Sequence, residues 1–139
     1  NILDKKAIEE KIPILGVCLG MQLMTNCSEE GSLDGLGWIP GSSIKFPSIR
    51  EIKVPHMGWN KAIPYSYNSL TENVVEDSRY YFVHSYYVSV DNSKYSIMRS
   101  HYGIEFDSAI SKDNIYGVQF HPEKSHKYGI QILKNFSNL

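Results

Sequence analysis

The segment from Gly16 to Gly20 places a cysteine between two glycines, after an apolar run and before helix-forming residues. This pattern is typical of a nucleophile elbow, a sharp strand-to-helix turn, with Cys18 where serine is more usual. We expect both flanking glycines to be required, because side chains there would collide with neighbouring backbone. The start of the helix should favour the reactive thiolate, and the Leu19 N–H could bind an oxyanion. A buried structural cysteine in a glycine-flanked turn is the alternative.

A second segment, Ile115 to Glu123, contains the base that a thiol nucleophile requires. A short apolar run ends near His121, and Pro122 restricts the backbone between His121 and Glu123. We expect Glu123 to accept a hydrogen bond from one imidazole nitrogen while the other faces the sulfur. A loop histidine beside a solvated carboxylate would have the same residues, so this motif gains its weight from being combined with Cys18.

The elements around these motifs predict an α/β fold. A first helix should end near Lys11, with Asp4 as its cap and Leu3, Ala7 and Ile8 as its buried stripe. The nearly all-apolar run over 12–17 predicts a parallel strand buried on both faces, and 19–26 predicts a helix.

The middle of the chain is rich in β-branched and aromatic residues and predicts an antiparallel section. Expected strands cover 43–46, 52–54, 80–83, 86–90, 95–101 and 108–111, with a further strand at 115–119 and turns at 58–60, 64–68 and 91–93. The helical spacing of Tyr128, Ile132, Leu133 and Phe136 predicts an amphipathic C-terminal helix. One domain spanning 1–139 accommodates all of these elements.

Composition argues against several classes of protein. The net charge of −1 gives no general attraction to nucleic acid or anionic membrane, and we see neither a membrane-spanning run nor a signal peptide. Cys18 and Cys27 have the spacing of neither a redox pair nor a zinc site, so free thiols in a cytoplasmic protein are expected. The other histidines have no metal-ligand spacing, and neither a metal nor an organic cofactor is expected; they are His56, His84, His101 and His126.

The two motifs together resemble the signatures of the class I (triad-type) glutamine amidotransferases, at Pro13–Gln22 and Gly117–Ser125. The resemblance implies a flavodoxin-like fold with a parallel sheet. It also implies a catalytic triad of Cys18, His121 and Glu123 that hydrolyses L-glutamine to glutamate and ammonia.

Within this family, the sequence is most similar to the glutaminase subunits of imidazole glycerol phosphate synthases. The similarity is carried by Ser28–Gly31, Gly35–Gly37, Ile39–Gly41, Pro55–Asn60 and Tyr81–Tyr86. It implies an oxyanion donor at Leu19, substrate contacts at Gly20, Gln22, Glu30, Ser85 and Tyr86, and a partner interface at Trp59, Tyr81 and Lys124.

The resemblance further implies a heterodimer with a (β/α)8-barrel cyclase of histidine biosynthesis, to which the ammonia is passed. A related barrel partner in amino- or amidino-sugar (surface polysaccharide) biosynthesis remains open, as does a non-catalytic regulatory or binding module on the same fold. A cysteine protease or γ-glutamyl hydrolase fits the contexts of Gln22 and His121 less well. The family also has an N-terminal segment with the first sheet strands and a second oxyanion donor. We therefore expect an N-terminally truncated domain whose sheet lacks its N-terminal part.

Overall fold

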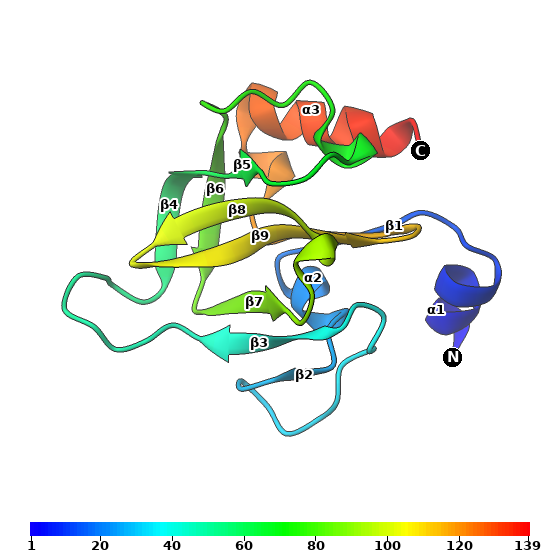
Figure 1. Cartoon of the computed structure of the whole chain (residues 1–139), viewed down its shortest axis with the longest axis horizontal. Helices are drawn as coiled ribbons and strands as arrows, with labels where there is room; N and C mark the ends of the chain where they lie inside the picture. Colours follow the sequence, from blue (N-terminus) through cyan, green and yellow to red (C-terminus); the bar gives the residue numbers. More distant parts are fainter.

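The computed structural model describes all residues 1–139, in an α/β arrangement (Figure 1). Its helices are α1 (Ile2–Asp4), which continues as a π-helical turn (Lys5–Glu9), α2 (Leu19–Leu23) and α3 (His126–Ser137). The strands are β1 (Ile14–Val17), β2 (Cys27–Ser28), β3 (Gly41–Lys45), β4 (His56–Lys61), β5 (Ile63–Pro64), β6 (Arg79–His84), β7 (Tyr86–Val90), β8 (Ser96–Tyr102), β9 (Ile104–Lys112) and β10 (Ile115–Val118). Three short 3-10 turns cover Ser69–Thr71, Ser93–Tyr95 and Pro122–Lys124.

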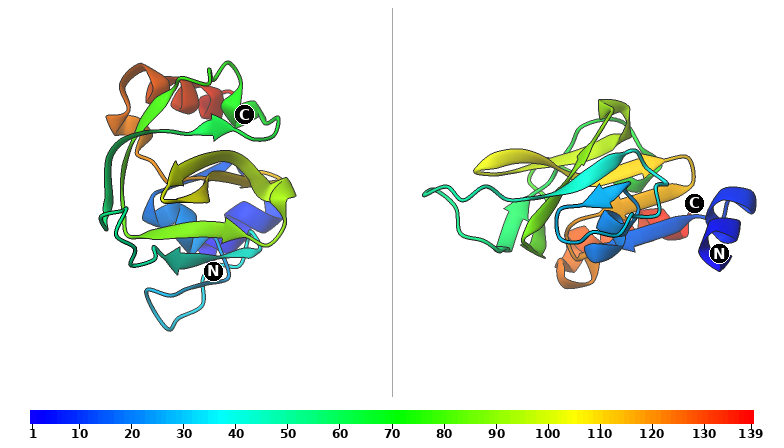
Figure 2. Two further views of the ribbon diagram at one scale, coloured as in Figure 1. Left: turned by 60° about the vertical axis from the view of Figure 1, so that its left-hand side comes forward. Right: turned by 90° about the horizontal axis from the view of Figure 1, so that it is seen from below.

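The main sheet has eight strands in the order β1-β10-β9-β7-β3-β2, with β8 paired to β9 and β5 to β8. Only β1–β10 and β2–β3 are parallel pairs, and β4 and β6 form a separate antiparallel pair. The strands curl around the core instead of lying in one plane (Figure 2). The predicted α/β class with an antiparallel section is confirmed, although its parallel part is small.

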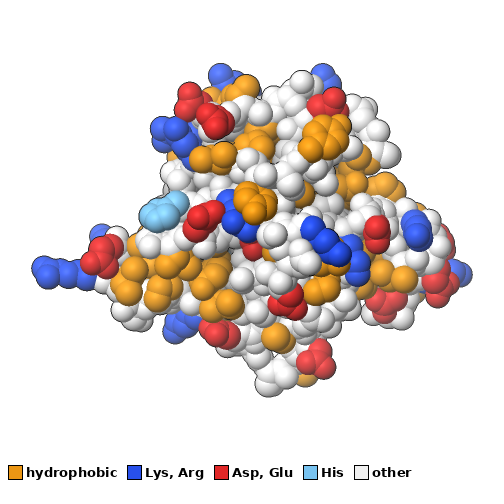
Figure 3. Space-filling view, in the orientation of Figure 1, with side chains coloured by type: hydrophobic (Ala, Val, Ile, Leu, Met, Phe, Trp, Pro, Cys, Tyr) orange, Lys and Arg blue, Asp and Glu red, His pale blue; other side chains and the backbone are white.

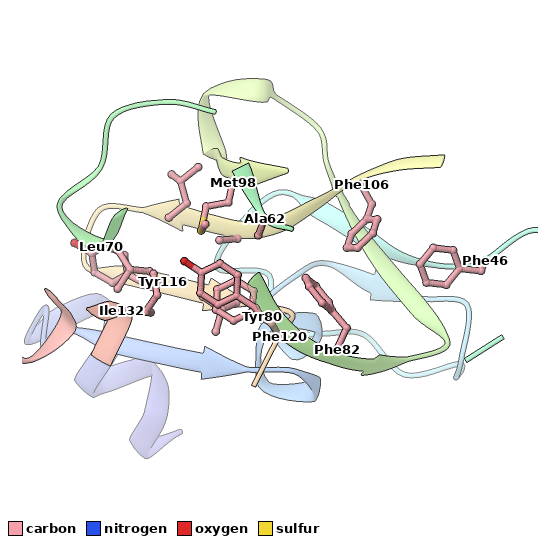
Figure 4. Close-up of a cluster of buried hydrophobic side chains, with 13 residues drawn as sticks. Phe46, Ala62, Leu70, Tyr80, Phe82, Met98, Phe106, Tyr116, Phe120 and Ile132 are labelled. Carbon is pink, nitrogen blue, oxygen red and sulfur yellow. The ribbon is translucent and has the colours of Figure 1, made fainter. Parts of the chain in front are cut away.

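A hydrophobic core of aromatic and aliphatic side chains lies between the curled strands and α3 (Figure 4). The rings of Tyr80 and Phe120 stack with centroids 4.1 Å apart, and Ile132 of α3 is fully buried in the same cluster. Strand β6 alternates between exposed and buried positions, so that Tyr80, Phe82 and His84 all point inward. The buried row of β6 therefore ends in a polar side chain.

The first helix differs from the prediction. Asn1 is the cap, and Asp4 forms a reciprocal capping box with it while also accepting a hydrogen bond from the indole of Trp38 at 2.9 Å. Of the expected stripe only Ala7 is buried, whereas Leu3 and Ile8 are 55% and 51% exposed. The helix ends at Glu9, because the turn that follows places Lys11 at a positive φ of 52°.

One predicted strand and one predicted turn were also wrong. Residues 52–54 form no strand, and the turn expected at 58–60 lies inside β4. The turn-forming residues Gly58 and Asn60 are held in β4 by cross-strand pairing with β6, which overrides their local preference. Gly58 adopts a φ of 118°, which favours glycine. The very short strands β2 and β5 were not predicted, and α2 ends at Leu23, earlier than expected.

Acidic and basic side chains are interspersed over the face shown in Figure 3, with no large area of a single sign. No helix combines the length and the apolar character needed to cross a bilayer.

Candidate active site

The elbow at Cys18 is built by the parallel pairing of β1 with β10, in which Val17 lies opposite Val118. The Cys18 N–H extends this pairing by donating to the Val118 carbonyl at 2.8 Å. Cys18 has φ 53° and ψ −107°, a conformation that side chains rarely adopt. Such strain is characteristic of functional positions, and here it turns the chain sharply from β1 into α2.

The two flanking glycines are not equivalent. A Cβ on Gly16 would lie 2.7 Å from the backbone carbonyl of Gly20, so a side chain cannot fit there. A Cβ on Gly20 would meet nothing within 4 Å. The expectation that both flanks exclude side chains was therefore wrong for Gly20, which leaves open space beside the nucleophile.

The sulfur of Cys18 is partly buried and takes part in two hydrogen bonds. It donates to the Val83 carbonyl at 3.7 Å and accepts from Nε2 of Gln119 at 3.6 Å. Burial raises the pKa of the Cys18 thiol, while the N–H of Leu19 and the Gln119 amide act to lower it. The direction of this pKa shift is opposite to the expected preference for thiolate, because burial of the sulfur outweighs the two hydrogen bonds that favour the charged form. Deprotonation therefore requires a base.

His121 and Glu123 are joined by a short hydrogen bond, with Nδ1 and Oε1 2.6 Å apart. The backbone holds the imidazole in place, because the His121 N–H donates to the Tyr81 carbonyl at 2.9 Å. Ser125 donates to the His121 carbonyl at 2.6 Å and accepts from the Tyr81 N–H at 3.0 Å. Nε2 of His121 is therefore the nitrogen left to take up a proton. Sulfur and imidazole share no hydrogen bond in this structure.

Gln22 is linked by hydrogen bonds to Tyr86 and to Gln119, the residue that contacts the sulfur. Nε2 of Gln22 donates both to the Tyr86 carbonyl and to Oε1 of Gln119, each at 3.1 Å. Only the oxygen of the Gln22 amide is then left for a ligand. The carbonyl of Ser85 accepts from the Phe46 N–H at 3.2 Å. The carbonyls of Ser85 and Tyr86 are thus both used inside the protein.

An open cleft of about 510 Å³ lies beside α2 and includes Leu19, Gln22 and Glu30. Glu30 is exposed, and its charge, like that of Glu123, contributes to raising the pKa of Cys18. Three of the predicted site residues therefore line one cleft next to the elbow.

The predicted interface residues come together on one surface. Trp59 is 46% exposed, and its ring packs edge-on against Tyr81 with centroids 6.1 Å apart. Nζ of Lys124 lies 6.0 Å from the centre of the Tyr81 ring. His126 stacks on Trp59 at 5.3 Å, a contact that the sequence did not indicate.

A second cleft, of about 560 Å³, is lined by residues of β4, β5 and β8 and by Tyr65 and Glu105, and contains none of the predicted site residues. Arg99 in this cleft is paired with Glu105 and Asp107 and lies over the ring of Tyr65. No group of three or more acidic, histidine or cysteine side chains is arranged to hold a metal ion.

Sequence analysis missed Gln119, which contacts both Cys18 and Gln22. It lies within the second motif, two positions before His121, and directly after β10. Its place in the motif was the available signal, since the contact itself joins segments far apart in the chain.

Comparison with known proteins gives consistent matches. The family model described as "Glutamine amidotransferase class-I" matches residues 2–138. The chain is 55% identical to imidazole glycerol phosphate synthase subunit HisH 2 of Methanococcus maripaludis, over 98% of this chain and 67% of the relative. It is 45% identical to subunit HisH of Bdellovibrio bacteriovorus, over 100% of this chain and 70% of the relative.

Two solved structures share the fold at low identity. A glutamine amidotransferase from Thermotoga maritima superposes with a TM-score of 0.65 at 18% identity, covering 99% of this chain and 52% of the other. One from Methylobacillus flagellatus superposes with a TM-score of 0.60 at 20% identity, covering 99% and 48%. The chain thus spans about two thirds of the length of these relatives and about half of these solved structures.

Proposed function

Because the chain belongs to the class-I glutamine amidotransferase family, we propose that it is the glutaminase component of an imidazole glycerol phosphate synthase. In this role it releases ammonia from L-glutamine for histidine biosynthesis. The observation that carries the proposal is the elbow cysteine at the edge of the sheet that also bears the His121–Glu123 pair. Identities of 55% and 45% to HisH subunits support the choice of pathway.

The reaction begins with proton transfer from Cys18 Sγ to Nε2 of His121. The thiolate attacks the side-chain amide carbon of glutamine, and the tetrahedral intermediate collapses as His121 returns the proton to the departing ammonia. Water then loses a proton to His121, attacks the thioester carbon and displaces the thiolate, which leaves glutamate. Glu123 holds Nδ1 of the imidazole and stabilises its charged form.

The oxyanion of each intermediate needs hydrogen-bond donors. The Leu19 N–H, directly after the nucleophile, provides one. The relatives are longer than this chain, which covers 67% and 70% of their lengths. We assign the second donor to the part of the full-length protein that corresponds to their unmatched residues. This is consistent with the open space beside Gly20. Gly20, Gln22, Glu30, Ser85 and Tyr86 would contact the amino-acid end of the substrate.

Ammonia is protonated in water and then no longer reacts as a nucleophile, so it must reach its acceptor without contact with bulk solvent. We place the partner, a (β/α)8-barrel cyclase in a heterodimer, against the surface formed by Trp59, Tyr81 and Lys124. An exposed tryptophan and a partly exposed tyrosine beside a lysine are suited to such an interface. The free thiols of Cys18 and Cys27 fit a cytoplasmic setting.

The test uses the full-length protein with its co-purified partner and glutamine labelled with ¹⁵N in the amide. We expect label in the imidazole product, and we expect Cys18→Ser to abolish glutamate release. If Cys18→Ser released glutamate at the wild-type rate, Cys18 would not be the nucleophile. Label in an amino sugar would exclude the histidine pathway, and no hydrolysis with the partner present would favour a non-catalytic module.

A further inference from the structure

The carbonyl oxygen of Tyr86 is the centre of a buried hydrogen-bond network. It accepts hydrogen bonds from Nδ1 of His84 at 2.7 Å and from Nε2 of Gln22 at 3.1 Å. A carbonyl oxygen only accepts hydrogen bonds, so each partner must present an N–H to it. This one acceptor therefore determines the orientation of the Gln22 amide and the tautomer of His84.

The Gln22 branch leads to the sulfur. With its N–H groups turned toward Tyr86, Gln22 also donates to Oε1 of Gln119 at 3.1 Å. Nε2 of Gln119 then faces the Cys18 sulfur at 3.6 Å. Reversing Gln119 would bring two NH2 groups together, and reversing Gln22 would bring two oxygens together. The Tyr86 carbonyl therefore determines, through the side chains of Gln22 and Gln119, that an N–H group faces the sulfur.

The His84 branch leads away from the sulfur and is fixed at its far end. Burial lowers the pKa of His84 to about 4 and that of His56 to about 3, so both rings are neutral near pH 7. Nε2 of His84 then accepts from Nδ1 of His56 at 2.9 Å. Nε2 of His56 accepts from Asn60 at 3.3 Å, and the same amide group donates to the His101 carbonyl at 2.9 Å. Both histidines must therefore carry their proton on Nδ1.

We propose that Gln119 is the residue that stabilises the Cys18 thiolate, and that Gln22, His84 and His56 are positioning residues that keep its N–H aimed at the sulfur. A hydrogen bond to a charged acceptor is stronger than one to a neutral acceptor, so this contact strengthens when the thiol loses its proton to His121. The inference rests on the proposed function only in taking Cys18 as the nucleophile.

The other groups that face the sulfur oppose or supplement this effect. The Val83 carbonyl accepts from the thiol and so favours its protonated form. The carboxylates of Glu123 and Glu30 also disfavour the thiolate, while the Leu19 N–H favours it. Gln119 is the one side chain among these that donates to the sulfur, so its removal takes away the side-chain hydrogen bond to the thiolate.

The first test measures the rate at which iodoacetamide alkylates Cys18 across a range of pH. It uses the full-length protein carrying Cys27→Ser, because Cys27 is an exposed second thiol. We expect Gln119→Met, which has similar volume and no N–H, to raise the apparent pKa of Cys18 and slow alkylation about tenfold near neutral pH. An unchanged pH profile would overturn the proposal.

His84 variants test the positioning role. We expect His84→Phe to shift the profile in the same direction by a smaller amount. In His84→Asn the profile should stay close to that of the unmodified protein, because the amide nitrogen of Asn can occupy the place of Nδ1. Equal shifts of the pH profile in both variants, at matched melting temperatures, would show that His84 does not position the Gln119 amide.

A third measurement needs neither activity nor a variant. In ¹⁵N-labelled full-length protein near pH 7, two-bond ¹⁵N–¹H correlations should show His56 and His84 neutral with the proton on Nδ1. A proton on Nε2 of either ring, or a charged ring, would overturn the network. If the network is confirmed but no glutamine is hydrolysed with the partner present, the proposed function fails and the network stands.

Discussion

The backbone N–H of Cys18 donates to the carbonyl of Val118 at 2.8 Å, one step beyond the last paired residues of β1 and β10. Because the two strands are parallel neighbours, their carboxyl ends reach the same edge of the sheet. The elbow at the end of one strand and the His121–Glu123 pair beyond the other are therefore placed together. The following predictions concern the residues that hold this edge in position.

Replacing Gly16 with alanine should damage the elbow far more than the same change at Gly20. The Cβ of Gly16→Ala would lie 2.7 Å from the Gly20 carbonyl and must push α2 away from β1. We expect glutaminase activity to fall by roughly 100-fold, as for misplacement of reacting groups, with a lowered melting temperature. Gly20→Ala, with nothing within 4 Å, is the matched control for stability. Equal melting temperatures for the two variants would contradict this account.

Replacing Glu123 with glutamine should lower kcat for glutamine hydrolysis while leaving KM little changed. Gln can still hydrogen-bond to Nδ1 of His121 but no longer stabilises the charged imidazole. The pair is partly open to solvent, since Glu123 is 52% exposed, so we expect a loss of roughly 100-fold. Steady-state kinetics of the full-length protein with its partner would measure it. Glu51→Gln, in an exposed loop, is the control, and a rise in KM alone would argue against the assigned role.

The stability of the fold should decrease on acidification because of His56 and His84. Their pKa values, about 3 and about 4, lie below the ordinary 6.5, so the unfolded chain binds protons that the native state does not. The stability that these neutral rings provide is therefore complete above pH 6.5 and is lost progressively as the pH falls toward 4 for His84 and toward 3 for His56. The slope for each histidine is about 1.4 kcal/mol per pH unit.

Urea unfolding at several pH values would measure this slope. The variant His56→Phe, whose ring can keep the stacking on Phe82 and Tyr102, should flatten the dependence by roughly half. A variant with the slope of the unmodified protein would show that His56 is not the group responsible.

Asn135 should contribute to stability well beyond its size. Its amide donates to the carbonyls of Leu70 and Glu72, at 2.8 and 2.7 Å, and so ties α3 to the turn before β6. Asn135→Ala leaves the buried Leu70 carbonyl without that donor, and we expect the free energy of unfolding to fall by about 1–3 kcal/mol. Asn138→Ala, at the exposed end of α3, should change it little. Similar losses in both variants would contradict this role for the two hydrogen bonds of Asn135.

Local sequence was sufficient where a structural feature depends on neighbours in the chain. The strand-to-helix turn at Cys18 and the contact between His121 and Glu123 were predicted, because strand, turn and motif follow one another within a few residues. The C-terminal helix was predicted for the same reason, since its apolar residues repeat at helical spacing. Local sequence failed at Gly58 and Asn60, where pairing with β6 overrides turn preference.

The sequence by itself determined which side chains could do chemistry and which residue types must surround them. Only the tertiary structure decided that Gln119 faces the Cys18 sulfur, that Gly16 and not Gly20 excludes a side chain, and that burial raises the pKa of the thiol. The physical reason is that hydrogen-bond polarity, steric exclusion and desolvation depend on groups brought together across strands. The Tyr86 carbonyl joins His84 to Gln22 although they are far apart in the chain, and no local pattern encodes that meeting.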